Sequence, residues 1–271
     1  FCLASPQPRR ANAKSSPPAE AALVVRLISD GEVVDPVWDS AVSRALMLRV
    51  AGGDLPETLR VSRPGAAVAF GKRDVVSEGY GPAVVAARVG GFEAVERLAG
   101  GRAAVFHEGT LHIGHAVRDA QPRSRVTGRF EETAALVARA LGRLGVDARV
   151  GEVAGEYCPG EHSVNARGAT KLMGLGQRVI KDGSYTGGVV VVAGGDRIRE
   201  VLGPVYEALG LDWLPETAGS VADERPGVTW EEVRAAIEAE YAALHDLEPA
   251  ELDDETLALA RRLAPEHRSS G

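Results

Sequence analysis

The 271-residue sequence has few cysteines and no long basic or apolar run. Its two cysteines, Cys2 and Cys158, exclude a zinc site built from four thiolates and offer no framework of structural disulfides, so no metal is expected. Such sparse cysteine use fits a reducing, cytoplasmic compartment. The formal net charge is -7, and basic residues gather only in short pairs such as Arg9-Arg10, so nucleic acid is not an expected partner. No apolar stretch is long enough to cross a bilayer, so a membrane is not expected either.

The first residues differ in composition from the rest of the chain. Residues 1–20 are rich in proline, alanine and serine, so we predict a disordered tail or a remnant of protein production and exclude them from the fold. The sequence is 45% hydrophobic and 25% charged, which is typical of a soluble globular protein. The predicted folded body therefore contains a single thiol, that of Cys158.

Hydrophobic periodicity predicts mostly antiparallel strands with helices between them and a helical end, which is an α+β arrangement. Asp35-Pro36 is expected to cap and begin the first helix, and Thr229 with Glu232 forms a capping box for a later one. Asp182-Gly183 predicts a hairpin turn. Strands are expected at residues 21–29, 59–61, 66–70, 110–117, 148–153 and 189–193, and helices at 37–50, 82–89, 130–144, 229–244 and 254–263.

The pair Gly100-Gly101 lies between Arg97 and Arg102. Glycines at such a place form a tight hairpin, or they let backbone N–H groups approach an anion or a carbonyl. A hairpin is the more common use of such a pair, and both interpretations stay open. The sequence has no glycine-rich dinucleotide motif after a strand and no P-loop.

Histidines offer a second set of candidates. On a strand, His112 and His115 point to opposite faces, so they do not predict a metal site. A pair of Cys158 with His107 or His162 stays open as a nucleophile and its base.

Cys158 stands directly before the turn formed by Pro159-Gly160. A turn is an unusual place for a cysteine that only fills a core. The neighbouring Glu156 and Glu161 would disfavour a thiolate, so another group, a histidine or Lys171, would have to activate the thiol.

Lys171 lies in an apolar predicted strand, ATKLMGLGQ. Its side chain is expected either on a solvated face or in a ligand pocket. Taken alone, the sequence favours the solvated face, because a buried lysine without a partner is costly.

Two segments resemble a known family. YCPGEHSVNARGATKLMGLGQR, from Tyr157 to Arg178, and RLAGGRAAVFHEGTL, from Arg97 to Leu111, are similar to motifs of the lipoate–protein ligase and octanoyltransferase superfamily. The YCPG sequence with a later K-x-x-G-x-x-Q-R is most similar to its cysteine-dependent branch, the octanoyl-[glycine cleavage H protein]:protein N-octanoyltransferases. The first segment carries the proposed nucleophile, and the second resembles the glycine-rich lipoyl pocket.

The resemblance implies a biotin/lipoate-ligase-like catalytic domain at residues 21–225, with a mixed, mainly antiparallel sheet flanked by helices, and a helical C-terminal extension at 226–271. It implies that Cys158 is the nucleophile of an acyl-thioester intermediate and that Lys171 contacts the acyl carbonyl. The residues that it implies for substrate binding are Arg97, Gly100, Gly101, His107, Gly174 and Gln177.

The implied reaction moves an octanoyl or lipoyl group onto a lysine of a lipoyl-domain protein. The implied partners are the glycine cleavage H protein and the E2 subunits of 2-oxoacid dehydrogenases, and no cofactor is needed. Two alternatives stay open. One is a lipoate–protein ligase that uses ATP and Mg²⁺, whose members have a histidine similar to His107. The other is an inactive module that only binds acyl groups.

Overall fold

The structure is a computed structural model that describes residues 24–269. The predicted tail at residues 1–20, with Cys2, lies outside the described residues. In chain order the elements are β1 (Val24–Val34), α1 (Pro36–Gly52), β2 (Thr58–Pro64), β3 (Ala67–Phe70), α2 (Lys72–Val75), α3 (Tyr80–Val89), β4 (Glu93–Glu96), β5 (Ala104–Phe106), β6 (Thr110–Arg118), α4 (Val126–Arg143), β7 (Ala148–Val150), β8 (Val164–Ala166), β9 (Thr170–Ile180), β10 (Gly183–Val191), α5 (Gly195–Leu209), α6 (Val221–Glu224), α7 (Trp230–Ala242), β11 (Asp246–Pro249) and α8 (Asp254–Leu263).

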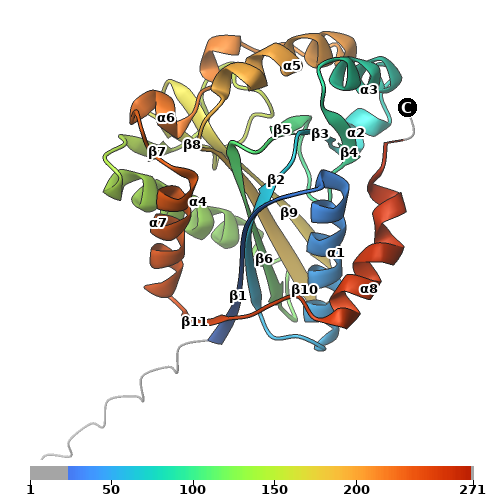
Figure 1. Cartoon of the computed structure of the whole chain (residues 1–271), viewed down its shortest axis with the longest axis vertical. Helices are drawn as coiled ribbons and strands as arrows, with labels where there is room; N and C mark the ends of the chain where they lie inside the picture. Colours follow the sequence, from blue (N-terminus) through green and yellow to red (C-terminus); the bar gives the residue numbers. More distant parts are fainter. Residues whose placement is uncertain (1–23, 270–271) are drawn as a thin grey trace, which may run out of the picture.

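The strands form one large sheet and one small sheet (Figure 1). The large sheet has eight strands in the order β11-β1-β2-β6-β10-β9-β8-β7, and the small sheet has three in the order β4-β3-β5. In the large sheet β1 pairs in parallel with β11 and β2, and the other neighbouring strands are antiparallel. The predicted α+β fold with a mixed, mainly antiparallel sheet is confirmed.

Strand register gives the large sheet an apolar face and a more polar one. Side chains alternate between the faces along each strand. The apolar face presents Leu59 and Val61 of β2 and Leu111 and Ile113 of β6, which belong to the main hydrophobic core. The opposite face presents the residues between them, including Arg60, Ser62, His112 and Gly114, and these pair across β2 and β6.

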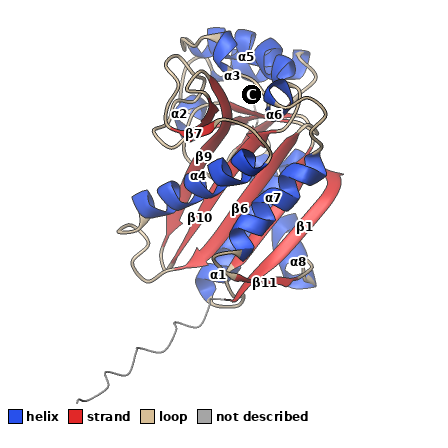
Figure 2. Ribbon diagram, turned by 90° about the vertical axis from the view of Figure 1, so that its left-hand side faces the viewer, coloured by secondary structure: helices blue, strands red, loops and turns tan. Residues whose placement is uncertain are grey.

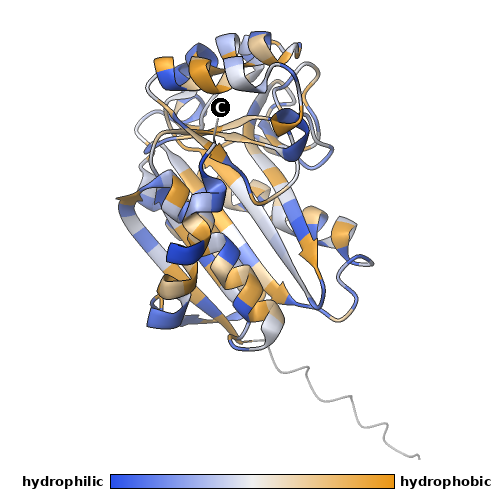
Figure 3. Ribbon diagram, turned by 90° about the vertical axis from the view of Figure 1, so that its right-hand side faces the viewer, coloured by the Kyte–Doolittle hydropathy of each residue, from blue (hydrophilic) through white to orange (hydrophobic). Residues whose placement is uncertain are grey.

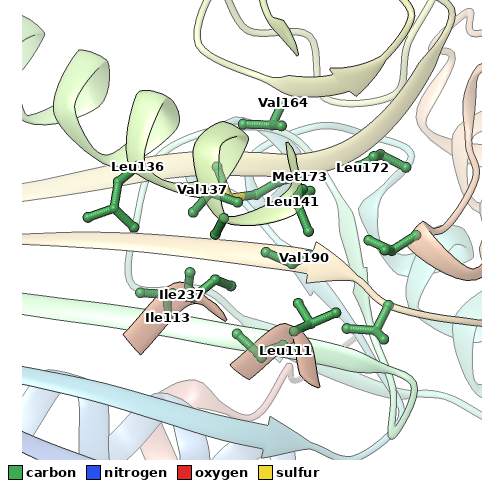
Figure 4. Packing of buried hydrophobic residues seen from close by; sticks show 14 of the residues in the cluster. Leu111, Ile113, Leu136, Val137, Leu141, Val164, Leu172, Met173, Val190 and Ile237 are labelled. Atoms are coloured by element: carbon green, nitrogen blue, oxygen red, sulfur yellow. The ribbon is translucent and has the colours of Figure 1, made fainter. Parts of the chain in front are cut away.

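Helices α4 and α7 cover the apolar face (Figure 2). In Figure 4, Leu136, Val137 and Leu141 of α4 lie over Met173 and Val190 of the sheet. Burying one such side chain stabilises a fold by roughly 1.5–3 kcal/mol. Because α4 and α7 occupy the apolar face, the more polar face of the large sheet is the one left for other elements to cover.

The more polar face is covered by α1 and, at one end, by the small sheet. Met47 and Val50 of α1 pack against Ala116 and Tyr185 of the sheet, and α8 lies along the outer side of α1 (Figure 1). Helices α3 and α5 enclose a second core around the small sheet. The colouring in Figure 3 alternates along the strands, as expected for a sheet that is covered on both faces but differs between them.

Several local predictions are confirmed. The Asp35 side chain accepts a hydrogen bond from the Trp38 N–H at the start of α1, and Thr229 and Glu232 form the expected capping box of α7. The hairpin expected near Asp182-Gly183 joins the antiparallel strands β9 and β10, but its two turn residues are Lys181 and Asp182, because Gly183 already pairs with Ile180. Asp182 has φ of 60°, a left-handed conformation that suits aspartate and asparagine better than bulkier residues.

Two features differ from expectation. The Gly100-Gly101 segment is not a hairpin, because β4 and β5 both pair with β3, which lies between them. The chain after residue 225 also contributes more than helices, since β11 pairs with β1 at the edge of the large sheet. The C-terminal segment thus packs into the same layers as the preceding chain.

Candidate functional site

A cavity lies between the more polar face of the large sheet, α1 and the small sheet. The cavity is narrow, with a volume of about 70 Å³. Its walls come from all three layers and include Pro36, Ala67, Ala69, Val95, Leu98, Ala99, Ala104, Phe106, Leu175 and Val189. Apolar walls of this shape fit a slender hydrocarbon chain.

A row of glycines crosses the sheet beneath this cavity. Gly176 of β9, Gly187 of β10 and Gly114 of β6 are direct neighbours in the register. A Cβ at Gly114 would lie 2.4 Å from the hydroxyl oxygen of Tyr185, and a Cβ at Gly187 would lie 2.9 Å from the Cε1 of the same ring. The ring of Tyr185 therefore lies over two of these glycines and closes part of the groove.

Cys158 lines the cavity from a loop and is half-buried. Its φ is 43°, a left-handed conformation that non-glycine residues adopt at a cost of roughly 1–2 kcal/mol. The loop is fixed behind it by Tyr206, whose hydroxyl accepts a hydrogen bond from the Cys158 N–H and donates one to the Ala103 carbonyl. Burial raises the pKa of Tyr206 well above its usual value, so the hydroxyl keeps the proton that it donates.

Two N–H groups point at the sulfur of Cys158. The backbone nitrogen of Arg102 lies 3.2 Å from Sγ, and the Arg97 guanidinium lies 3.9 Å from it. Arg97 also donates to the Arg102 carbonyl at 2.9 Å, and the Arg102 side chain pairs with the buried Asp74 at 3.1 Å. This arrangement offers a dipole and a full positive charge to a thiolate, which is the reactive form of cysteine.

Gly101 makes this approach possible. Its φ is 116°, and a Cβ there would lie 2.9 Å from the sulfur of Cys158 and 3.0 Å from the Arg97 guanidinium. Gly101 is thus required for close approach of backbone to the protein's own thiol. The approach of this backbone to an anion or carbonyl of a ligand stays a prediction.

Glu156 does not face the thiol as an unpaired acid. Its carboxylate is buried and accepts hydrogen bonds from the backbone N–H groups of Val153 and Gly160 and from the hydroxyl of Ser163. It also accepts from the ammonium of Lys171 at 2.9 Å. The expected repulsion from this glutamate is therefore largely neutralised by Lys171.

Lys171 is buried, not solvated, and the preference for a solvated face was wrong. Its side chain is 1% exposed. Its ammonium donates to Glu156 and to the carbonyls of Tyr157 and Cys158, at 3.0 and 2.8 Å, and lies over the Tyr157 ring at 4.9 Å. These partners remove the cost that makes an unpaired buried lysine rare.

Three further polar side chains, Asp39 of α1, His112 of β6 and Tyr185 of β10, line the cavity and bond to one another. The Asp39 carboxylate accepts hydrogen bonds from Arg60, Ser62 and His112, at 2.8, 2.7 and 2.7 Å, and the other ring nitrogen of His112 lies 3.1 Å from the Tyr185 hydroxyl. Burial alone would raise the pKa of Asp39, but Arg60 and His112 outweigh it and hold the pKa well below its usual range. The group is a rigid, internally bonded wall of the cavity.

The remaining predicted residues occupy different places. Gly174 lines the cavity. The Gly100 N–H donates to the Gln177 carbonyl at 3.3 Å, while the Gln177 side chain bonds to Arg129 and the Val126 carbonyl on α4. Gln177 thus supports the glycine loop through its backbone.

His107 and His162 are not placed at the thiol. The Nδ1 of His107 accepts a hydrogen bond from the Gly109 N–H, and its ring lies against Gly194. His162 stacks on Phe130. Within the described part of the chain, neither His107 nor His162 lines the cavity or hydrogen-bonds to Cys158. Within residues 24–269 there is no cluster of His, Cys, Asp or Glu suited to a metal ion.

Sequence reasoning missed several contributors to the site. The Arg102 N–H acts through the backbone and so leaves no signal in residue type. Tyr206 is 48 positions from Cys158, and no local pattern links them. Glu156 was noticed, but its partner Lys171 could only be assigned once the β8–β9 hairpin was known.

The fold and site together define a mixed α+β domain with a thiol at an apolar cavity between two sheets. The chain belongs to the family of the lipoyl protein ligase A/B catalytic domain, whose model matches residues 35–242. Among the described residues, no helix is both long and apolar enough to span a membrane.

Named relatives agree with this family. The chain is 25% identical to an octanoyl-[GcvH]:protein N-octanoyltransferase of Bacillus velezensis over 205 residues, which are 73% of this chain and 71% of that protein. A crystal structure of lipoate-protein ligase A bound with ATP has the same fold, with a TM-score of 0.70, 20% identity and coverage of 89% of this chain and 94% of the other. A lipoate protein ligase of Thermoplasma acidophilum, studied with its E2 lipoyl domain, gives a TM-score of 0.68 at 19% identity, covering 90% and 93%.

Proposed function

We propose that this protein is an acyltransferase that moves an octanoyl or lipoyl group through a thioester on Cys158 to a lysine of a lipoyl-domain protein. The observation that carries the proposal is the position of Cys158. Its thiol lies at an apolar cavity, 3.2 Å from one N–H donor and 3.9 Å from a guanidinium. The family of the chain and its octanoyltransferase relative support the same reaction.

In the first step, the Cys158 thiolate attacks the carbonyl carbon of the acyl donor. The S–C bond forms, the bond from that carbon to the donor's leaving atom breaks, and the leaving group takes a proton from water, which balances the proton that the thiol gave to water when it ionised. In the second step, the ε-amine of the acceptor lysine attacks the thioester carbon, gives a proton to water and releases the thiolate. Covalent catalysis of this kind divides one difficult transfer into two easier ones.

The cavity and the donors around the sulfur have separate tasks in this reaction. The Arg102 N–H and the Arg97 guanidinium stabilise negative charge on sulfur before attack and when the thiolate leaves. The acyl chain lies in the apolar cavity, where each buried methylene stabilises binding by roughly 0.8 kcal/mol.

Lipoyl-domain proteins are the proposed partners. The relative of Bacillus velezensis is named for an octanoylated glycine cleavage H protein, and the Thermoplasma ligase was studied with an E2 lipoyl domain. We propose the H protein and E2 subunits as donor and acceptor for this chain, in the cytoplasm and without a cofactor.

The test is intact mass spectrometry of the protein after incubation with octanoylated H protein. The parent is expected to gain one octanoyl group, the Cys158→Ala variant none, and the parent alone is expected to pass the group to an E2 lipoyl domain. Exchange of pyrophosphate into ATP, together with full transfer by Cys158→Ala, would instead identify a ligase. Binding of octanoate without any adduct or transfer would identify an acyl-binding module.

A further inference from the structure

We propose that Asp74 is a positioning residue that, through the side chain of Arg102, holds the Arg102 backbone N–H against the sulfur of Cys158. Asp74 does not line the cavity, and neither of the two transfer steps uses it. The inference rests on the proposed function only in taking Cys158 as the nucleophile. It assigns a role to a buried carboxylate that lies behind the thiol.

The carboxylate of Asp74 binds two neighbouring segments at once. Its side chain is 0% exposed. One oxygen, Oδ1, accepts a hydrogen bond from Nη1 of Arg102 at 3.1 Å, and the other, Oδ2, accepts one from the Gly71 N–H at 2.9 Å. Such partners offset the cost of removing a carboxylate from water. Asp74 therefore connects the start of α2 to the residue whose backbone faces the thiol.

The backbone around this connection is closely packed. A Cβ on Gly71 would lie 1.9 Å from the Gly101 carbonyl oxygen, so the start of α2 and the Gly100-Gly101 segment touch through their backbones. Arg102 follows directly, and its N–H lies against Sγ of Cys158, with 3.2 Å between nitrogen and sulfur. Because the side chain and the N–H of Arg102 belong to one residue, fixing the side chain from behind limits the directions in which the N–H can point.

Charge alone predicts the opposite effect of Asp74. A carboxylate near a thiol disfavours the thiolate, so its removal should make the thiolate form more easily. Positioning predicts the reverse, because without the carboxylate the Arg102 N–H is no longer held at the sulfur. The other charged and titratable groups close to the thiol are the same in both cases, and they include Arg97, the pair of Lys171 and Glu156, Tyr157 and Tyr206.

The experiment measures alkylation of Cys158 by iodoacetamide over a range of pH in the parent, in Asp74→Asn and in the double variant with Arg102→Gln. Iodoacetamide reacts with the thiolate, so the pH at half-maximal rate, the midpoint, reports how readily the thiol ionises. The mass of the peptide that carries Cys158 separates it from Cys2, and urea unfolding reports whether each variant is folded. Ser77→Ala is the matched control, because the Ser77 hydroxyl donates to the backbone carbonyl of Asp74 and not to its carboxylate.

Asp74→Asn is expected to raise the midpoint by about one pH unit and to slow alkylation by about 10-fold at a pH below the midpoint. This is the change that follows the loss of a hydrogen bond to a charged group. The double variant, which removes one charge of each sign, should show the same rise, because both changes break one connection and are therefore not additive. Ser77→Ala should keep the midpoint of the parent.

The opposite results are equally specific. A midpoint that falls or stays unchanged in Asp74→Asn would overturn the inference, since charge alone would then account for the carboxylate. If Asp74→Asn does not fold, the neutral double variant decides: a raised midpoint supports the inference, and the midpoint of the parent overturns it. An equal rise in Ser77→Ala would also overturn it, because loosening of the segment would then be enough. A parent that forms no octanoyl adduct would instead disprove the proposed function, and the alkylation rates would still decide the role of Asp74.

Discussion

The sulfur of Cys158 lies 3.2 Å from the backbone nitrogen of Arg102, although the two residues are 56 positions apart in the chain. They meet because Gly101, just before Arg102, has no side chain to hold the two segments apart. The environment of the thiol is therefore built largely from backbone, which makes it sensitive to changes in residue size as well as in charge.

Replacing Gly101 with alanine is expected to slow octanoylation of Cys158 by about 100-fold or more, since the new Cβ would meet the sulfur at 2.9 Å and φ of 116° strains any other residue. Gly100→Ala is the matched control, because a Cβ there would have the Gln177 carbonyl at 4.0 Å as its nearest neighbour. Octanoylation rates from intact mass measure both. Equal effects of the two variants would contradict the proposed contact.

Arg97→Gln is expected to reduce octanoylation of Cys158 by about 10-fold, the loss that follows when a charged hydrogen-bond donor is replaced by a neutral one. The guanidinium holds the Arg102 carbonyl as well as facing the sulfur. The control is Arg178→Gln, since Arg178 lines the adjoining groove together with Arg97 but not the cavity of Cys158. A larger loss in the control than in Arg97→Gln would argue against a role of Arg97 at the thiol.

Tyr185→Ala is expected to shift the preferred acyl chain to greater length. Removing the ring opens the groove above Gly114 and Gly187, and each added methylene that becomes buried should favour the longer donor by about 4-fold, equivalent to ~0.8 kcal/mol. Competition between donors of eight, ten and twelve carbons, read as adduct masses on Cys158, measures the shift. Tyr185→Phe keeps the ring and should keep the parent's preference. A parental length profile in Tyr185→Ala would show that the ring does not limit the chain.

Stability is expected to fall as pH decreases below about 6.5. Burial, with Arg197 adding to it, lowers the pKa of His107 from 6.5 to about 4. Between these two values the unfolded chain binds a proton at His107 that the folded protein does not, so stability is complete above about pH 6.5 and is lost toward pH 4.

His107→Gln should lack this part of the loss. We expect the parent to lose ~1–2 kcal/mol more than His107→Gln between pH 7.5 and 5 in urea unfolding. The same decrease in both proteins would mean that other groups carry the pH dependence.

Local structure was largely predictable because it depends on neighbouring residues. The last helix was expected at residues 254–263 and is found at Asp254–Leu263, since its capping aspartate and its apolar stripe are both local. The position of β3 between β4 and β5 was not predictable, because the pairing depends on contacts between separate segments. The strand β11 gave no signal either, since DLEP has neither apolar alternation nor a strong preference for strand.

The same distinction holds for the site. Cys158 and Arg97 were identified by motif and lie together in the structure. The burial of Lys171 was missed, because its favourable partners come from a loop 13 to 15 positions earlier and meet it only when β8 and β9 pair. Residue type suggested which groups matter, while the tertiary fold decided what each of them contacts.

The strand β11 also has a consequence for how the protein behaves in solution. It pairs with the outer edge of β1, where unpaired backbone N–H and C=O groups would otherwise be free to pair with a strand of another molecule. The strand β11 itself contains Asp246 and Glu248, which are exposed, and ends at Pro249, which has no N–H to donate. The strand β11 thus covers one edge of the large sheet, and a shortened protein that ends after α7 is expected to leave the edge of β1 open to pairing with another copy.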